Sequence, residues 1–279
     1  MARLLFALGL SILMVIHTRR KKSLTIDGAV GAFFLGMITF SSTYFFFTVV
    51  LLSFFLSSSK LTKFKADRKK LIEIDYEKSS ERDLTQVVCN GLLGGIAVGL
   101  FHYLGEPTTT CYDQSKLHTV MMWIYIGHYG CCAGDTWASE LGVLNKGWPT
   151  LITTFKKVPP GTNGGVSPLG LAASIGGGAF IGLMGAICLA FESPCHGFAW
   201  DIIVLGSCAG LGGSLIDSVL GATVQQTLYS SKKKMVLNEA SKEDGDVISG
   251  HDILDNHQVN FLSSLLTSSA CGAVAYYLN

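Results

Sequence analysis

The chain has 279 residues, of which 49% are hydrophobic and only 15% charged, and its formal net charge is +1. Soluble domains carry about 25% charged residues, and the mean hydropathy of +0.42 also favours a membrane protein over a soluble one. The near-neutral charge gives no reason to expect a nucleic-acid partner, whereas the lipid bilayer is an expected partner.

Eight apolar segments separated by turn or charge signals predict eight membrane-spanning helices, because a helix needs about 20 apolar residues to cross the hydrocarbon core. In chain order they cover residues 2–17, 24–41, 43–59, 86–104, 118–134, 169–191, 198–216 and 259–278. The expected fold is therefore all-α: a polytopic helical bundle that forms a single integral membrane domain over residues 1–279.

The first apolar segment resembles a signal peptide in its length. Its basic residues, Arg19 to Lys22, follow the apolar stretch instead of preceding it, and no small-residue cleavage site stands out. We therefore interpret this segment as an uncleaved membrane span.

The basic residues predict how the bundle is oriented, because lysine and arginine are enriched in cytosolic loops. Three regions are expected on the cytosolic side: a charged loop at 60–85, a motif-bearing loop at 134–168 and a polar loop at 225–258, with residues 230–249 mobile. The same orientation leaves both termini outside the cytosol. With no targeting sequence, the endoplasmic reticulum or another endomembrane is favoured, with the plasma membrane as the alternative.

The eight cysteines include no CxxC pair with metal-site spacing. Cys111 and Cys195 fall in the two turns expected outside the cytosol, and we predict a disulfide between them. A zinc site built from His128, Cys131 and Cys132 stays open as an alternative. The many glycines inside the spans are interpreted as helix-packing contacts, because a phosphate loop needs a helix N-terminus that faces water.

A first polar motif, GDTWASELG at residues 134–142, follows the fifth span. Asp135 or Thr136 is expected to cap a new helix there. On that helix Asp135 and Ser139 share one face, as do Thr136 and Glu140, because residues four apart are neighbours. Carboxylates and hydroxyls at the mouth of a bundle are the hard oxygen ligands that Mg²⁺ prefers.

A second motif covers residues 156–168, where two lysines precede a glycine-rich loop. Its backbone N–H groups would form an anion-binding nest, with Lys156 or Lys157 supplying positive charge for a phosphate group. The alternative is a tight turn before the sixth span, with lysines whose aliphatic stems lie along apolar surface.

A third motif surrounds Asp217, which lies at or just beyond the end of the seventh span next to Ser218. A carboxylate in that position is costly unless it is paired or binds a cation, which makes it a candidate functional group. Asn256 and Asn260 share a helical face at the start of the eighth span and form a weaker cluster, which helix capping partly explains.

The strings GDTWASELG, PPGTNGGVSPLG, GGSLIDSVLGATVQ and DNHQVNFLS resemble the transmembrane protein 19 family, and the resemblance runs from about Arg19 to the end of the chain. That family is similar to phytyl-phosphate kinase and polyprenyl-phosphate kinases, and more distantly to CTP-dependent dolichol kinase. GSLIDSVL also looks like the signature of CDP-diacylglycerol synthases, but Ser214 and the Gly221-Ala222 pair depart from it, which argues against a cytidylyltransferase.

The motifs and the resemblance together predict an integral membrane kinase that transfers phosphate from CTP or another nucleotide to an isoprenoid alcohol or monophosphate at the cytosolic face. The site assignments are Asp135, Asp217 and Lys156 for catalysis; Asp135, Glu140 and Asp217 for Mg²⁺; and Thr136, Ser139, Gly161, Thr162, Asn163, Gly164, Gly165, Ser218, Asn256 and Asn260 for substrate or nucleotide. The alternative is a non-catalytic transporter or a sensor of a small ligand, whose site is expected near the midplane.

Overall fold

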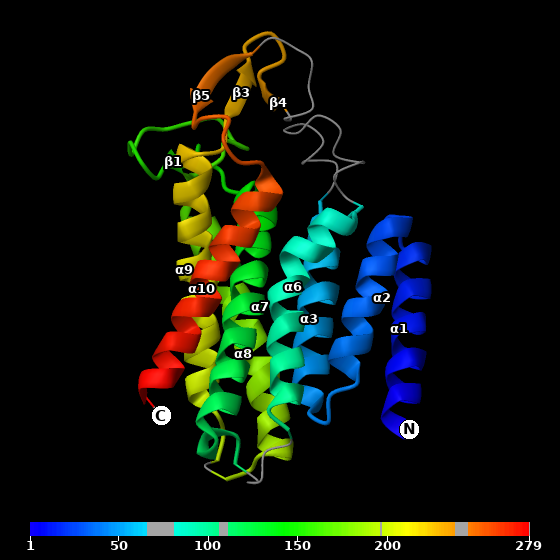
Figure 1. The fold of residues 1–279 in the computed structure, drawn as a ribbon. Coiled ribbons are helices and arrows are strands. Elements are labelled where there is room, and N and C mark those ends of the chain that lie inside the picture. The colour runs from blue at the N-terminus through cyan, green and yellow to red at the C-terminus, as the bar shows by residue number, and fades with distance from the viewer. Residues whose placement is uncertain (66–80, 106–110, 196, 238–244, 279) are drawn as a thin grey trace.

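A computed structural model describes residues 1–65, 81–105, 111–195, 197–237 and 245–278. Within them are eight α-helices: α1 (Ala2–Arg20), α2 (Ile26–Phe40), α3 (Phe45–Lys63), α6 (Leu84–Tyr103), α7 (Lys116–Gly142), α8 (Pro168–Glu192), α9 (Trp200–Thr223) and α10 (Asn256–Leu278), together with the short 3₁₀ helix η1 (Tyr112–Gln114). The helices run along a common axis as one bundle, so the predicted helical membrane fold is confirmed (Figure 1).

Six of these helices, α1, α3, α6, α8, α9 and α10, are long and apolar enough to cross a membrane. Helix α2 has 15 residues and is shorter than a usual span. Helix α7 has 27 residues but carries several histidines and tyrosines. It packs against α3, α6, α8, α9 and α10, so protein surrounds its polar side chains instead of lipid.

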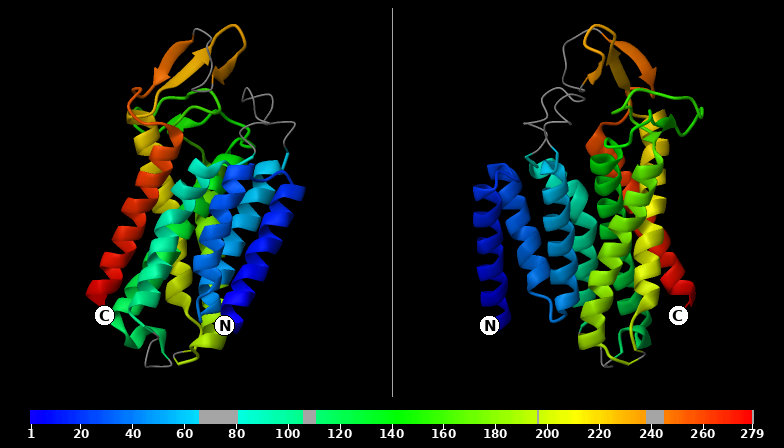
Figure 2. Two further views of the ribbon diagram at one scale, coloured as in Figure 1. Left: turned by 45° about the vertical axis from the view of Figure 1, so that its right-hand side comes forward. Right: turned by 180° about the vertical axis from the view of Figure 1, so that it is seen from behind.

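The two ends of the bundle differ. One end, which we call the motif end, carries the short strands and the polar motifs, whereas both termini and the turns near residues 111 and 195 lie at the opposite end, the terminal end (Figures 1 and 2). An even number of helices returns the chain to the end where it began. The structure thus separates the motifs from both termini, as the eight predicted segments require.

Close helix packing explains the glycines of the central bundle. A Cβ atom built on Gly178 of α8 would lie 2.0 Å from the carbonyl oxygen of Gly206 of α9, and one on Gly134 of α7 would lie 2.5 Å from the Cα of Gly210. Side chains at these positions would force the backbones apart. These contacts support the interpretation of the glycines as packing residues.

Two predicted boundaries are wrong. Helix α7 continues without interruption to Gly142, so no new helix begins at Asp135 or Thr136. Helix α9 continues to Thr223, beyond the predicted end of the seventh segment at 216, so Asp217 lies within the helix, which is one of the two placements expected for it. The reason is the same in both cases: neighbouring helices cover these polar turns, and the helical hydrogen bonds persist where the hydropathy has already fallen.

The predicted mobile loop at 230–249 contains regular structure, which corrects that expectation. Strands β3 (Thr227–Ser230), β4 (Met235–Leu237) and β5 (Asp246–Ser249) form an antiparallel sheet in the order β4-β3-β5, while residues 238–244 lie outside the described residues. A second antiparallel pair joins β1 (Thr150–Leu151) to β2 (Gly165–Val166) within the motif-bearing segment. Most of the predicted charged loop, residues 66–80, also lies outside the described part.

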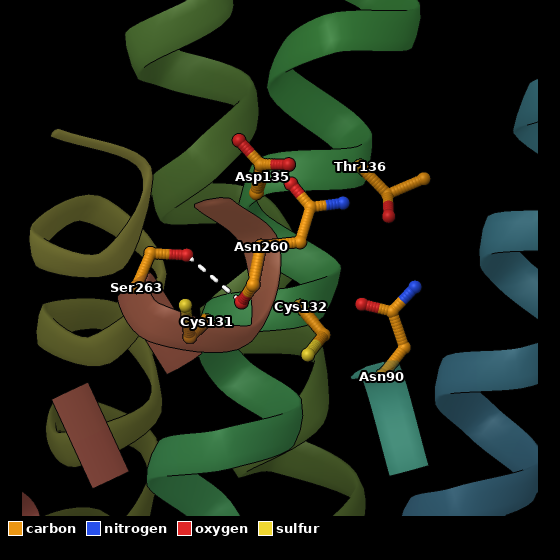
Figure 3. Close-up of a pocket in the computed structure, with 7 residues that line it drawn as sticks. All are labelled: Asn90, Cys131, Cys132, Asp135, Thr136, Asn260 and Ser263. Carbon is orange, nitrogen blue, oxygen red and sulfur yellow. Dashed lines mark hydrogen bonds between the residues drawn. The ribbon is translucent and has the colours of Figure 1, made fainter. Parts of the chain in front are cut away.

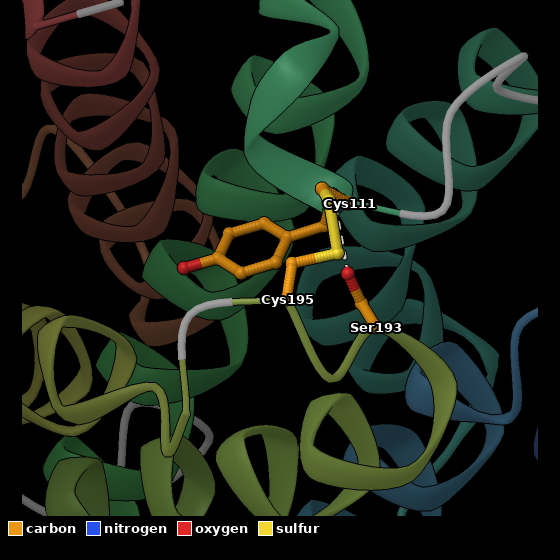
Figure 4. The surroundings of a disulfide bond; sticks show 4 residues. Cys111, Ser193 and Cys195 are labelled. Carbon is orange, nitrogen blue, oxygen red and sulfur yellow. Dashed lines mark hydrogen bonds between the residues drawn. A yellow bond between two sulfur atoms is a disulfide. The ribbon is translucent and has the colours of Figure 1, made fainter.

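The predicted disulfide between Cys111 and Cys195 is confirmed, and it cross-links the terminal end of the bundle. The Cα atoms of the two cysteines are 5.5 Å apart (Figure 4). The backbone N–H of Tyr112 donates to Ser193 Oγ at 2.7 Å, and the Tyr112 hydroxyl donates to Asp201 at 2.8 Å. Burial and this bond to Asp201 raise the pKa of Tyr112, so it stays a neutral donor. These bonds join η1, just before α7, to the end of α8 and the first turn of α9.

The disulfide supplies a test of orientation. In sealed microsomes, whose cytosolic face points outward, we expect a membrane-impermeant maleimide to label Cys111 and Cys195 only after permeabilisation and reduction, because both would face an oxidising, non-cytosolic space. A cysteine introduced at exposed Lys156, at the motif end, should become labelled without permeabilisation. The opposite labelling pattern would reverse the predicted orientation.

Glu192, the last residue of α8, caps a neighbouring helix. Its carboxylate oxygens accept hydrogen bonds from the backbone N–H groups of Phe45 at 2.6 Å and Phe46 at 2.9 Å, in the first turn of α3. Those N–H groups have no partner within their own helix, and a carboxylate there also interacts favourably with the helix dipole.

We expect Glu192→Gln to lower the free energy of unfolding by about 1 kcal/mol and Glu192→Ala by about 2–3 kcal/mol, because alanine leaves both N–H groups unbonded. Thermal unfolding of the purified protein in detergent measures the effect. Equal melting temperatures for both variants and the wild type would contradict the capping role.

Candidate functional site

A small polar pocket opens between α6, α7 and α10 toward the motif end. Its empty volume, including the open mouth, is about 220 Å³. Seven residues line it: Asn90, Cys131, Cys132, Asp135, Thr136, Asn260 and Ser263 (Figure 3). Three of them, Asp135, Thr136 and Asn260, were predicted as site residues, and they come from two different motifs.

Asp217 of α9 does not line this pocket, but two lining residues of α10 hold its carboxylate. Ser263 Oγ donates to its Oδ2 at 3.2 Å. The Asn260 amide is oriented so that its nitrogen faces acceptor oxygens. In this orientation the nitrogen donates to Asp217 Oδ2 at 3.0 Å and to the Asn256 carbonyl at 3.2 Å. Asn256 thus contributes its backbone, while its side chain is exposed. Asn260, from the cluster at the start of the eighth predicted span, therefore helps to fix the carboxylate of Asp217.

Asp135 of α7 is less constrained. In the described part of the chain its carboxylate accepts no hydrogen bond, and the charges of Asp217 and Glu140 are close enough to act on it. Figure 3 shows its side chain next to that of Asn260. Partly buried carboxylates in a membrane bundle repel each other unless a cation or a donor lies between them, so this arrangement is suited to binding a cation.

The sequence analysis missed the α6 side of the pocket. Asn90 points into it beside Thr136 (Figure 3), and its backbone carbonyl is 3.0 Å from His128 Nε2. Arg82, just before α6, places its guanidinium over the rings of Phe54 and Phe55, at 5.7 and 6.0 Å from their centroids. The spacing of four between Arg82, Gln86 and Asn90 was the available signal.

The zinc alternative gains no support from the structure. Cys131 and Cys132 are buried, and Nε2 of His128 is engaged with Asn90. Among the described residues no group of three or more His, Cys, Asp or Glu side chains could hold a metal ion. A cation bound by Asp135 and Asp217 would therefore need further ligands from its substrate.

The glycine-rich loop packs onto the motif end of α9. Gly161 and Gly164 have positive φ angles of 89° and 77°, and a Cβ on Gly164 would lie 2.5 Å from the Ser218 carbonyl. The N–H groups of Thr162, Asn163 and Gly165 donate to Pro159, to Thr227 Oγ1 and to Thr162. Three N–H groups of the expected nest are thus engaged within the protein, and Asn163 lies outside the pocket lining.

The remaining predicted residues occupy different surroundings. Lys156 is exposed at the β1 hairpin, whereas Lys157 donates to the Trp148 carbonyl at 2.9 Å and to Thr150 Oγ1 at 3.0 Å. Ser139 is exposed and donates to the carbonyl of Thr136 in its own helix at 3.0 Å. The structure thus brings Asp135, Thr136, Asp217 and Asn260 together and leaves Lys156 and Ser139 at the surface.

Comparison with known proteins places the chain in a family. Residues 9–268 match the family described as "Integral membrane protein DUF92". The chain belongs to this family. It is also 40% identical to "Protein PGR" of Arabidopsis thaliana over 285 residues, which covers 99% of this chain and 97% of that protein.

Two more distant relatives of this DUF92 member are an archaeal and a bacterial protein. An uncharacterized membrane protein of Methanocaldococcus jannaschii is 27% identical over 80% of this chain and 84% of its own length. One of Synechocystis is 26% identical over 74% of this chain and 73% of its own. No solved structure matches. The family level of the resemblance is confirmed, and the protein is a multi-pass integral membrane protein.

Proposed function

We propose that this protein transfers a phosphoryl group from a nucleotide, with CTP favoured, to an isoprenoid alcohol or monophosphate. The observation that carries the proposal is that Asp135 of α7 lines the polar pocket within electrostatic reach of Asp217 of α9, whose carboxylate is held by two residues of that lining, Ser263 and Asn260. Phosphoryl transfer depends mainly on the positioning of the reactants and on stabilisation of charge. Two positioned carboxylates and a nearby arginine can supply both.

The donor set of the pocket fits Mg²⁺. Asp135 and Asp217 offer hard oxygen ligands, and Mg²⁺ in kinases is usually bound by one or two carboxylates plus substrate phosphates. Asp217 is already oriented by Ser263 and Asn260, while Asp135 is open to a ligand. When bound, the ion would neutralise charge on the transferring phosphate. Glu140 interacts electrostatically with both Asp135 and Arg82. Its attraction to Arg82 therefore competes with its predicted role as a ligand of Mg²⁺.

The depth of the pocket does not separate a kinase from a transporter. Asp135 lies seven residues before the end of α7 at Gly142, and Asp217 six residues before the end of α9 at Thr223. At 1.5 Å per residue, both lie about 10 Å from the motif end of their helices and about equally far from the midpoints of those helices. A transporter site near the midplane fits this depth as well. A lipid acceptor would place its chain among the helices and its headgroup at this depth.

The positive-inside rule further supports a cytosolic motif end, where nucleotides are available. Described basic residues gather there, including Lys21, Lys22, Lys60, Lys63 and the 232–234 run, whereas the terminal end has Arg3 and Lys116. Both termini would then be non-cytosolic.

The test is an assay of purified protein with Mg²⁺, CTP or ATP, and prenyl alcohols and prenyl monophosphates of several chain lengths. We expect a phosphorylated prenyl product that depends on Mg²⁺. Absence of product from every nucleotide–acceptor pair, with protein that is folded by size-exclusion chromatography, would count against the kinase and favour the transporter or sensor.

A further inference from the structure

Residues 146–158, which we call the basic hairpin, pack on the end of α9. The backbone N–H of Leu151 donates to the carbonyl of Lys156 at 2.9 Å, which closes the turn of the hairpin. Leu151 and Val158 are buried in one small hydrophobic cluster with Ala222, which lies in the last turn of α9. This packing gives the basic hairpin a fixed place beside the bundle.

The basic hairpin lies at the depth of the lipid headgroups. Helix α9 has 24 residues and is therefore about 36 Å long, whereas the hydrocarbon core of a bilayer is about 30 Å thick. The last turn of α9 thus reaches the headgroup layer, and the hairpin packs against that turn. The segment between α7 and α8 projects sideways beyond α9 at the motif end, where lipid would surround the bundle (Figures 1 and 2).

Two aromatic side chains of the basic hairpin are left exposed by the described part of the protein. Trp148 is 54% exposed and Phe155 is 82% exposed. Phe155 also has a positive φ angle of 56°, which is unfavourable for a bulky side chain and which glycine or asparagine would adopt at less cost. Aromatic rings are enriched where the hydrocarbon core meets the headgroups. The exposed rings therefore suit a lipid surface better than water.

The charges of the basic hairpin all have one sign. Lys146, Lys156 and Lys157 are exposed, and residues 143–167 contain no aspartate or glutamate. The ammonium group of Lys157 donates to the Trp148 carbonyl at 2.9 Å, so a positive charge lies beside an exposed indole residue. Anionic lipids of the cytosolic leaflet attract basic segments next to the membrane. The hairpin is thus complementary to such lipids in both charge and polarity.

We propose that the basic hairpin is a binding site for anionic phospholipids of the cytosolic leaflet. Trp148 and Phe155 lie against the upper part of the acyl chains, and Lys146 and Lys156 bind the headgroup phosphates. None of these residues lines the polar pocket, so the site is separate from it and does not depend on the proposed function. The bound lipid holds the segment between α7 and α8 at the membrane surface.

Bromine-labelled lipids quench a tryptophan that they contact, so they measure which lipid lies beside Trp148. The full chain is reconstituted in vesicles of equal parts phosphatidylcholine and phosphatidylserine, with bromine on the chains of one lipid or the other. The difference between the wild type and Trp148→Phe isolates the signal of Trp148. We expect brominated phosphatidylserine to quench it at least about twofold more strongly than brominated phosphatidylcholine, because the lysines attract the anionic headgroup.

The double variant Lys146→Gln/Lys156→Gln should remove this preference and still fold, because both side chains are exposed. The matched control is Lys232→Gln, which changes an exposed lysine in the turn between β3 and β4. That sheet lies beyond the ends of the helices (Figure 1), so the control should keep the preference at Trp148.

Trp200 is the matched aromatic control, since it is 69% exposed at the terminal end and is followed by Asp201 instead of lysines. Its signal, isolated with Trp200→Phe, should be quenched equally by the two lipids. The inference is overturned if Trp148 shows no greater preference than Trp200, or if its preference survives the loss of both lysines. Absence of quenching by either lipid would also overturn it, because the hairpin would then face water or another protein.

Discussion

Asp135→Asn and Asp217→Asn are each expected to lower phosphoryl transfer by at least about 1000-fold, which corresponds to about 4 kcal/mol of transition-state stabilisation. Asparagine keeps the shape of the side chain but not its charge, so the pocket loses an anionic ligand for the cation. Steady-state rates with CTP, Mg²⁺ and a prenyl monophosphate measure the effect. Excess Mg²⁺ should restore more activity to Asp217→Asn, because Asp135 remains open.

The matched control is Asp252→Asn, which changes an exposed carboxylate at the same end of the bundle. It should retain the wild-type rate. Both pocket variants should remain folded, because each relieves repulsion between neighbouring carboxylates. Activity within tenfold of the wild type in either pocket variant would contradict a shared cation site.

The second large effect is expected from the glycine contacts between α8 and α9. In Gly178→Ala the new methyl group would meet the backbone carbonyl of Gly206, 2.0 Å away in the wild-type arrangement. Backbone cannot rotate away as a side chain can, so the helices must separate. We expect a loss of about 2–3 kcal/mol in the free energy of unfolding, together with a loss of activity because α9 carries Asp217.

Gly212→Ala is the matched control, since a Cβ at this position of α9 has no neighbour within 4 Å. Alanine is favoured over glycine in a helix by about 1 kcal/mol, so this variant should be as stable as the wild type or more stable. Melting temperatures in detergent compare the two variants. Equal stability of Gly178→Ala and Gly212→Ala would refute the close-packing argument.

The sequence predicts the membrane bundle well because burial in lipid imposes a simple rule: about 20 apolar residues per crossing. The pairing of Cys111 with Cys195 was also predictable, since the orientation argument placed both in turns on the same side. The meeting of Asp135 and Asp217 is a more demanding prediction. It depended on the cost of carboxylates near a membrane, and it stays a prediction: Asp135 lines the pocket, whereas Asp217 lies outside that lining but within electrostatic reach of Asp135.

Other features of the structure could not be predicted from the sequence, because they depend on tertiary contacts. The end of α7 was misplaced because hydropathy falls at Asp135, although packed neighbours keep the helix intact to Gly142. Arg82 was read only as a basic loop residue, since nothing local indicates that Ser23 and Thr25 would hold it against the bundle. The β3–β5 sheet forms from short strands in a charged segment, where the alternation of apolar residues is too brief to be recognised.

The hold of α10 on Asp217 has a consequence for how the protein is made. Asn260 and Ser263 belong to α10, which is synthesised after α7 and α9, yet they orient a carboxylate on α9 and line the pocket beside Asp135. During translation, α7 and α9 enter the membrane with their carboxylates facing each other before these donors exist. The pocket is therefore completed only when α10 inserts, and a ribosome stalled before residue 256 would leave Asp217 without its two donors and exposed to quality control.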